Sequence, residues 1–356
     1  MDKVDGVKQK TQRIEYIDAM RGFTMIIVVL HHVSLMAFGV DSAFEKWSYE
    51  FRMPLFFFIS GFLMYKPLHV WGLKNTFSFL RKKVTNLIIS PLIFFSLYVY
   101  VYNKDMIEAL ASPAKAGYWF TFVLFTYFLI YIVCQVVFDK LKLSSKKKDL
   151  MLLCVGFLVF MGAYGISYLY LERNNFWAGF IGAGNLKYFI FLALGALAQK
   201  HFDKFERLLD ASPLVLISIL TYFLMNVFYN PINQMGGAVR LLFVLLSGVT
   251  GVIIAFALFR KYQNSVDSSH VGGRFLQFVG RRTLDIYFLH YFFIPYQLGK
   301  AFPIFSEYNL PLVEIACSLF IALLIIAACL GVSAVLRTSA TLGHILFGAK
   351  KDKRCA

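Results

Sequence analysis

Ten apolar runs divide this sequence, and the polar segments between them alternate between rich and poor in lysine and arginine. Most of the runs are long enough to cross a hydrocarbon core about 30 Å thick as an α-helix. The runs that we expect to span a membrane are residues 18–38, 51–66, 84–103, 118–138, 149–170, 186–199, 211–229, 240–259, 283–300 and 311–336. With 59% hydrophobic and 16% charged residues, the composition excludes an ordinary soluble domain. The sequence therefore predicts an all-α, polytopic membrane protein with about ten transmembrane helices in one bundle.

The alternation of basic connections also predicts the orientation. The two tails and the even-numbered connections hold 27 lysines and arginines, against 7 in the other five connections. Because cytoplasmic segments carry the excess of basic residues, both termini should lie in the cytoplasm. We expect a flexible cytoplasmic tail over residues 1–13, one membrane domain over 14–338 and a basic cytoplasmic tail over 339–356. The connection 260–282 is rich in Asn, Ser and Gly, which predicts a mobile loop.

The net charge and the cysteines exclude other classes of function. Basic connections that face an anionic leaflet account for the charge of +16. No stretch could fold into a basic soluble face, so nucleic acid is not an expected partner. The five cysteines include no CxxC pair, and we expect neither a disulfide framework nor a metal site.

The first apolar run carries the most informative polar residues. Arg21 and His32 are 11 residues apart, which puts them on one helix face, about 16 Å apart along the axis. Arg21 falls at the cytoplasmic end and His32 near mid-membrane, where polar side chains are costly and mark functional sites. Asp18 can cap this helix or pair with Arg21. His31 is rotated about 100° from His32 and should face different surroundings.

Structural readings of these two residues remain open at this point. Arg21 could be a basic anchor at the membrane surface, and His32 could be a core histidine with satisfied hydrogen bonds. If His32 is functional, a mid-membrane imidazole suits a general base, a nucleophile or a proton relay.

Two further segments add polar groups to the list. Arg52 should lie at the outer membrane surface, and Ser60 with Gly61 should let another helix approach closely. The triplet Arg81, Lys82 and Lys83 can set orientation or bind phosphates.

The ninth run adds Asp285, Tyr287 and His290 to an otherwise apolar helix. His290 should lie well inside the bilayer, about 11 Å along the axis from Thr283. Asp285 can belong to the site or pair with one of the two arginines that precede the run. No Asp or Glu falls in the middle of an apolar run, which disfavours a proton-coupled transporter.

Together these segments resemble the membrane acyltransferase-3 family. The resemblance is carried by Asp18, Arg21, Gly22 and His32 in the first run, by 53–62 (MPLFFFISGF) in the second, by Tyr118, Trp119 and Phe120 in the fourth, and by 283–290 (TLDIYFLH) in the ninth. It implies ten spans and an acyl-CoA-dependent O-acyltransferase that modifies sugar hydroxyls of cell-envelope glycans or their lipid-linked precursors. Many members have His in place of Arg52 and a second Arg in place of Asn86.

The resemblance implies roles for particular residues. His32 and Arg21 are the expected catalytic residues. Acyl-CoA, in the simplest case acetyl-CoA, is expected as a co-substrate rather than a bound cofactor, with contacts from Arg21, Arg81, Lys82 and Lys83. The expected substrate contacts are Asp18, Arg52, Ser60, Trp119, Tyr287 and His290. The acceptor should approach from the extracytoplasmic side, near Arg52, Glu172 or Trp177.

The expected setting is the cell membrane, which is the cytoplasmic membrane if the source is bacterial. Membrane lipids, a glycan or lipid-linked saccharide acceptor and envelope glycan-assembly proteins are the expected partners. The alternatives are a transporter or flippase for an amphipathic or glycan-lipid substrate, and a membrane sensor or scaffold.

Overall fold

The computed structural model describes residues 14–39, 43–67, 71–170, 176–228, 237–296, 298 and 311–349. All regular elements within these residues are helical, which confirms the all-α prediction. The α-helices are α1 (Glu15–Val33), α2 (Ala43–Met64), α3 (Leu73–Val84), α4 (Ser90–Val101), α5 (Met106–Ala111), α6 (Trp119–Lys140), α7 (Ser145–Tyr170), α8 (Phe176–Ile181), α9 (Phe189–Lys200), α10 (Phe202–Asp210), α11 (Ser212–Val227), α13 (Gly237–Lys261), α14 (Val271–Arg281), α15 (Thr283–Leu289), α18 (Pro311–Leu336) and α19 (Ala340–Phe347). Short 3₁₀ or π turns are η1 (Ser34–Phe38), η2 (Thr85–Ile89), η3 (Lys115–Gly117), η5 (Ala183–Tyr188), η6 (Gln263–Ser265) and η7 (His290–Phe292).

Seven helical segments in the described part of the chain are long and apolar enough to cross a membrane. They are Glu15–Phe38, Lys74–Val101, Trp119–Lys140, Ser145–Ile166, Phe176–Lys200, Val239–Lys261 and Leu312–Leu336. The pair α10 and α11, bent by 73°, would make an eighth span. The chain is therefore a polytopic membrane protein, whereas the count of ten spans and the cytoplasmic termini stay predictions.

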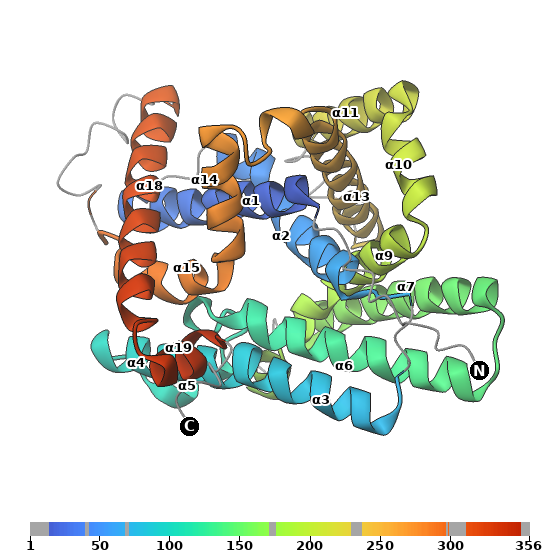
Figure 1. Ribbon diagram of the computed structural model, residues 1–356, viewed down its shortest axis with the longest axis horizontal. Coiled ribbons are helices and arrows are strands. Elements are labelled where there is room, and N and C mark those ends of the chain that lie inside the picture. Colours follow the sequence, from blue (N-terminus) through green and yellow to red (C-terminus); the bar gives the residue numbers. More distant parts are fainter. Residues whose placement is uncertain are drawn as a thin grey trace, which may run out of the picture.

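The connection over 260–282 is a folded element, and the prediction of a mobile loop there is wrong. Helix α14 occupies its second half and crosses α1, as Figure 1 shows. Its two contact points are glycines: a Cβ on Gly22 would overlap the Leu276 carbonyl, and a Cβ on Gly280 would overlap the Asp18 carbonyl. Small residues at a helix crossing let the two backbones approach closely. Gly280 is thus a packing residue at the crossing, whereas a Cβ on Gly272 would meet open space.

The ninth predicted span is broken rather than continuous. Helix α15 has only 7 residues and gives way to the 3₁₀ turn η7 at His290. Pro295 follows shortly afterwards, and a proline has no N–H with which to continue a helix. The break directs the last residues of α15 toward the second half of α1.

The sequence predicted that another helix approaches closely at Ser60 and Gly61, and the structure confirms this at Gly61. A Cβ on Gly61 would overlap the carbonyl of Leu192 in α9, and one on Gly195 would overlap that of Phe58 in α2. The backbones of α2 and α9 therefore touch, because each presents a glycine to the other.

Helix α1 connects two apolar clusters. Its first half, including Ile17 and Met20, packs with α2, α6, α9 and α13, and its second half, including Val29 and Val33, packs with α4, α15 and α18. The stretch predicted as a C-terminal tail contains α19, whose buried Phe347 packs against Phe94 of α4. Helix α1 is thus held on several sides along its length.

Asp285 is a structural ion-pair residue rather than part of the site. Its carboxylate accepts hydrogen bonds from Arg337 Nη2 (2.8 Å) and Nε (2.9 Å), and from Arg282 Nη1 (3.3 Å). The Ser333 hydroxyl also donates to it. The pairing with a preceding arginine that the sequence left open is therefore present, and Arg337 and Ser333 join α15 to α18.

Candidate functional site

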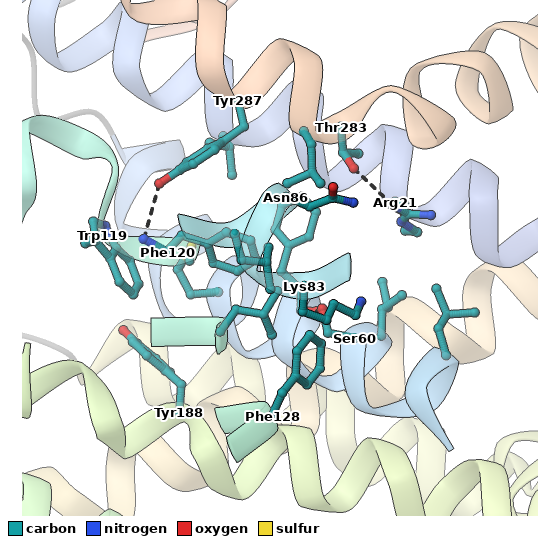
Figure 2. Close-up of a pocket in the computed structure, with 18 of the residues that line it drawn as sticks. Arg21, Ser60, Lys83, Asn86, Trp119, Phe120, Phe128, Tyr188, Thr283 and Tyr287 are labelled. Atoms are coloured by element: carbon teal, nitrogen blue, oxygen red, sulfur yellow. Dashed lines mark hydrogen bonds between the residues drawn. The ribbon is translucent and has the colours of Figure 1, made fainter. Parts of the chain in front are cut away.

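A cavity of about 910 Å³ lies among α1, α2, α3, η2, α6, η5 and α15. Its volume is near the upper end of the range for ligand pockets, about 300–1,000 Å³. Figure 2 shows Arg21, Lys83 and Asn86 toward one side of this cavity and Trp119, Tyr188 and Tyr287 toward the other. The cavity is large enough to hold an extended ligand between these two sides.

Most of the residues singled out in the sequence meet at this cavity. Those that line it are Arg21, His32, Arg52, Ser60, Lys82, Lys83, Trp119 and Tyr287. Three candidates do not line it: Asp18, Arg81 and His290. Asp18 lies 3.6 Å from Arg21 Nη1 through Oδ1, so the predicted pair forms behind the cavity wall. Arg81 is exposed and belongs to the outer surface.

His290 acts on the site through His32. The two rings are 5.0 Å apart between centroids and stacked, and His290 Nε2 lies 3.0 Å from His32 Nδ1. His290 is fully buried, with its Nδ1 at 3.0 Å from the Ile286 carbonyl oxygen and 2.9 Å from that of Tyr287. The predicted substrate contact is thus a neighbour of the proposed catalytic histidine.

These contacts assign the proton positions on both neutral rings. A carbonyl oxygen only accepts, so His290 Nδ1 carries a proton and Nε2 carries a lone pair. His290 Nε2 then accepts from His32 Nδ1–H, which leaves the lone pair of His32 on Nε2. The hydroxyl of Tyr291 lies 3.1 Å from that atom and donates to it. Two backbone carbonyls therefore direct the basic nitrogen of His32 away from His290.

The cavity-facing stripe of α1 comprises Arg21, Met25, Val28, His31 and His32, and Arg21 lies at the end remote from His32. Its Nη2 donates to Thr283 Oγ1 at 3.0 Å, at the start of α15. Because Arg21 and His32 both line the cavity, the predicted shared helix face is confirmed as geometry. His31 also lines the cavity, so the expectation of different surroundings for it is wrong.

The charged lining of the cavity is entirely basic. The lysines and arginines in it are Arg21, Arg52, Lys66, Lys82, Lys83 and Lys187. No Asp or Glu is among the described residues that line the cavity. Such a lining favours an anionic ligand.

Arg52, which the sequence predicts at the outer membrane surface, is covered by protein. It is only 4% exposed, and its Nη1 lies 3.5 Å from Ser48 Oγ. A hydropathy pattern does not reveal this burial, because it does not show which helix end is covered by neighbouring helices.

The wall opposite Arg21 and Lys83 is aromatic. Trp119 and Tyr188 stack with ring centroids 6.2 Å apart and an interplanar angle of 30°. The Tyr287 hydroxyl donates to the Gly117 carbonyl at 2.7 Å and accepts from Phe120 N–H at 3.2 Å. These bonds attach the first turn of α6 to α15 and fix that side of the cavity.

Lys115 anchors the loop beside this wall. Its Nζ donates to the carbonyls of Leu110 (3.1 Å) and Gly179 (3.0 Å), so the amine joins the connection before α6 to α8. Burial lowers the pKa of Lys115 to about 8, because removal from water disfavours the charged form. The contacts of Lys115 are structural, and it does not line the cavity.

Several site residues were missed by sequence reasoning. Lys66 and Lys187 looked like ordinary residues at span ends, and Tyr291 gave no signal beyond its place after His290. Trp177, suggested as an acceptor contact, is exposed on α8 and does not line the cavity. Glu172 lies outside the described residues. No group of three His, Cys, Asp or Glu in the described residues is arranged to hold a metal ion.

Comparison with known proteins gives one match. The sequence profile of acyltransferase family 3, described as an acyltransferase domain, matches residues 14–331. No curated protein and no solved structure matches the chain. The matched range contains every residue that lines the cavity.

Proposed function

Because this chain belongs to the acyltransferase-3 family and is a membrane acyltransferase, we propose that it acylates a hydroxyl of a cell-envelope glycan or lipid-linked sugar. The donor in this proposal is cytoplasmic acyl-CoA, in the simplest case acetyl-CoA, used as a co-substrate. The observation that carries the proposal is the His32–His290 pair at the wall of a basic cavity.

The donor is expected to enter at the Arg21 end of the cavity. Lys83 lies within electrostatic range of Arg21 and Lys66, and Lys82 also lines the Arg21 end of the cavity. Phosphate oxygens accept strong charge-assisted hydrogen bonds from such groups. A CoA anchored there by its phosphates would extend its acylated arm along α1 toward His32. Arg81 is exposed and outside the cavity, so its predicted contact with CoA is not part of this proposal.

Once the Tyr291 hydroxyl turns from His32 Nε2 to its other acceptor, the Gly117 carbonyl at 3.5 Å, His32 can use the lone pair on Nε2 in two ways. As a general base it takes the proton of the acceptor hydroxyl while that oxygen attacks the thioester carbonyl. The C–O bond forms, the C–S bond breaks, and the imidazolium returns the proton to the CoA thiolate. As a nucleophile it forms an N-acyl imidazolium as the C–S bond breaks and CoA thiolate leaves; the acceptor oxygen then displaces the imidazole, and the hydroxyl proton passes to the released Nε2 and from there to the CoA thiolate. In either route Nδ1–H stays hydrogen-bonded to His290.

The setting of the proposal is the cell membrane, which is the cytoplasmic membrane if the source is bacterial, where acyl-CoA and glycan precursors meet. Envelope glycan-assembly proteins would supply the acceptor. The runner-up, a transporter or flippase, would move such a substrate without consuming CoA. The absence of carboxylates from the described cavity lining argues against a proton-coupled carrier.

Release of CoA from labelled acetyl-CoA by the purified protein, with envelope glycan as acceptor, tests the proposal. We expect His32→Ala to lower this rate by at least about 100-fold, because positioned acid–base groups contribute roughly 10²–10⁴-fold. His201→Ala is the matched control, since His201 is exposed, bonds to Asp149 and does not line the cavity. Equal rates for His32→Ala and wild type would refute the catalytic assignment. Substrate movement across liposomes without CoA release would favour the transporter.

A further inference from the structure

The basic residues of the cavity fall into two separate groups. Helix α1 measures about 16 Å from Arg21 to His32, because each residue adds about 1.5 Å. One group lies at the Arg21 end, near the ends of α2 and α3, and comprises Arg21, Lys66, Lys82 and Lys83. Arg52 and Lys187 also line the cavity, and Lys187 lies beside Tyr188, which stacks on Trp119 at the wall away from Arg21; these two cations form a second group.

Glu50 is a described carboxylate near the second group, within electrostatic range of Arg52, Lys187 and Arg240. Glu50 and Arg240 do not line the cavity, whereas Arg52 and Lys187 do. The surface that a ligand meets beside His32 is therefore basic.

The proposed donor does not account for this second group. The phosphates of CoA lie at the end of the molecule remote from the thioester, and the pantetheine arm between them is uncharged. When the thioester is at His32 and the phosphates are at the Arg21 end, no charge of the donor reaches Arg52 or Lys187. A buried guanidinium is costly to desolvate, and an anionic ligand beside it offsets that cost.

An aromatic surface lies on the same side as the second group. Lys187 and Tyr188 are neighbours in η5, and Tyr188 stacks on Trp119, which also lines the cavity. Figure 2 shows Trp119 and Tyr188 together on this side. Aromatic faces present large apolar area, which suits the apolar face of a sugar ring.

We propose that the acceptor is an anionic saccharide, whose reacting hydroxyl lies near a carboxylate or phosphate held by Arg52 and Lys187. This inference rests on the proposed acyl transfer and names its acceptor class. Arg52 and Lys187 select the acceptor, and the Arg21 end holds the donor. The same arrangement explains why two of the cations that line the cavity, Arg52 and Lys187, lie away from the expected position of the donor phosphates.

The test measures CoA release from acetyl-CoA by the purified protein with three acceptors. Methyl glucuronide carries a carboxylate, glucose 1-phosphate carries a phosphate, and methyl glucoside is neutral. We expect kcat/KM for at least one charged sugar to exceed that for methyl glucoside by about tenfold, as one charge-assisted hydrogen bond provides. The better of the two charged sugars distinguishes a carboxylate from a phosphate acceptor. A neutral sugar used as well as both charged sugars would overturn the inference.

Variants separate the acceptor end from the donor end. Arg52→Gln and Lys187→Gln should raise KM for the charged sugar about tenfold and leave KM for acetyl-CoA within about twofold. Arg52→Lys, which keeps the charge, should retain the preference, and so should the control Arg240→Gln outside the cavity. A preference that survives both Gln substitutions would contradict the assignment to Arg52 and Lys187. Absence of CoA release with every sugar and with envelope glycan would instead refute the proposed acyl transfer, and this inference with it.

Discussion

At the scale of single residues, two stacked histidines have unequal roles. His32 lines the cavity and its Nε2 is hydrogen-bonded to the Tyr291 hydroxyl, whereas His290 is fully buried and does not line the cavity. The carbonyls of Ile286 and Tyr287 fix the proton on His290, and through it the tautomer of His32. His290 is therefore a positioning residue in the proposed reaction, with a role like that of the group that orients the imidazole in a catalytic triad.

Replacement of His290 tests this positioning role. We expect His290→Leu to lower kcat for CoA release by at least about 100-fold, because His32 loses the acceptor that holds its Nδ1–H. His290→Gln should recover part of the rate, since a side-chain carbonyl can accept the same bond, and the pH profile of kcat should shift in the Leu variant alone. A Leu variant with wild-type kcat, or a Gln variant no better than Leu, would contradict the role.

The basic triplet provides a second residue-scale prediction. Lys83→Gln should raise KM for acetyl-CoA by about tenfold, because one charge-assisted hydrogen bond to phosphate is lost. Lys83 lines the cavity with its Nζ 4.5 Å from the Phe128 ring centroid, whereas Arg81, two residues earlier, is exposed outside it. Arg81→Gln is thus the matched control and should leave KM within about twofold. Equal effects of the two substitutions would place the donor phosphates elsewhere.

At the scale of elements, the crossing of α14 over α1 supports the whole cavity-facing stripe. Helix α15 follows α14 after one residue, and Thr283, the first residue of α15, accepts the hydrogen bond from Arg21. A shift of α14 would therefore move the residues that set Arg21 and, through α15, His290. Gly22 and Gly280 are the positions at which such a shift can be forced.

Gly280→Ala should destabilise the protein by about 1–3 kcal/mol, because the added Cβ meets backbone atoms that cannot move aside easily. Gly331→Ala in α18 is the control, since a Cβ there meets nothing within 4 Å. Thermal unfolding of both variants in the same detergent measures the difference. Equal melting temperatures for the two variants would show that the crossing has more space than the structure indicates.

The elements also show what a sequence pattern reveals. Long apolar runs and basic connections predicted the membrane class and most helix positions, because a helix that crosses lipid needs a continuous apolar run of about 20 residues. Hydropathy could not separate α14 from a loop, since Gly272 and Gly273 at its start indicate flexibility and the packing role of Gly280 depends on its contact with α1. It also could not place the end of the ninth run, because α15 stops at a turn that tertiary contacts of His290 stabilise.

At the scale of the whole molecule, the cavity brings together segments far apart in the chain. The polar residues on α1 and the ninth run were found because charge in an apolar run is conspicuous. Lys66, Lys187 and Tyr291 were missed because each is ordinary in its own segment and acquires meaning only from its neighbours in space. The sequence therefore predicted the polar cavity residues of α1 better than Lys66, Lys187 and Tyr291, which line the same cavity.

The two separated groups of cations have a practical consequence for inhibitor design. A compound that joins an anionic group for the Arg21 end to a second anionic group for Arg52 and Lys187 through an uncharged linker, on the scale of the roughly 16 Å rise of α1 from Arg21 to His32, would engage both groups at once. Such a bisubstrate compound gains effective concentration at its second group once the first has bound. Simple donor analogues that engage the Arg21 end alone lack that gain, so the spacing along one helix sets the length of a selective inhibitor.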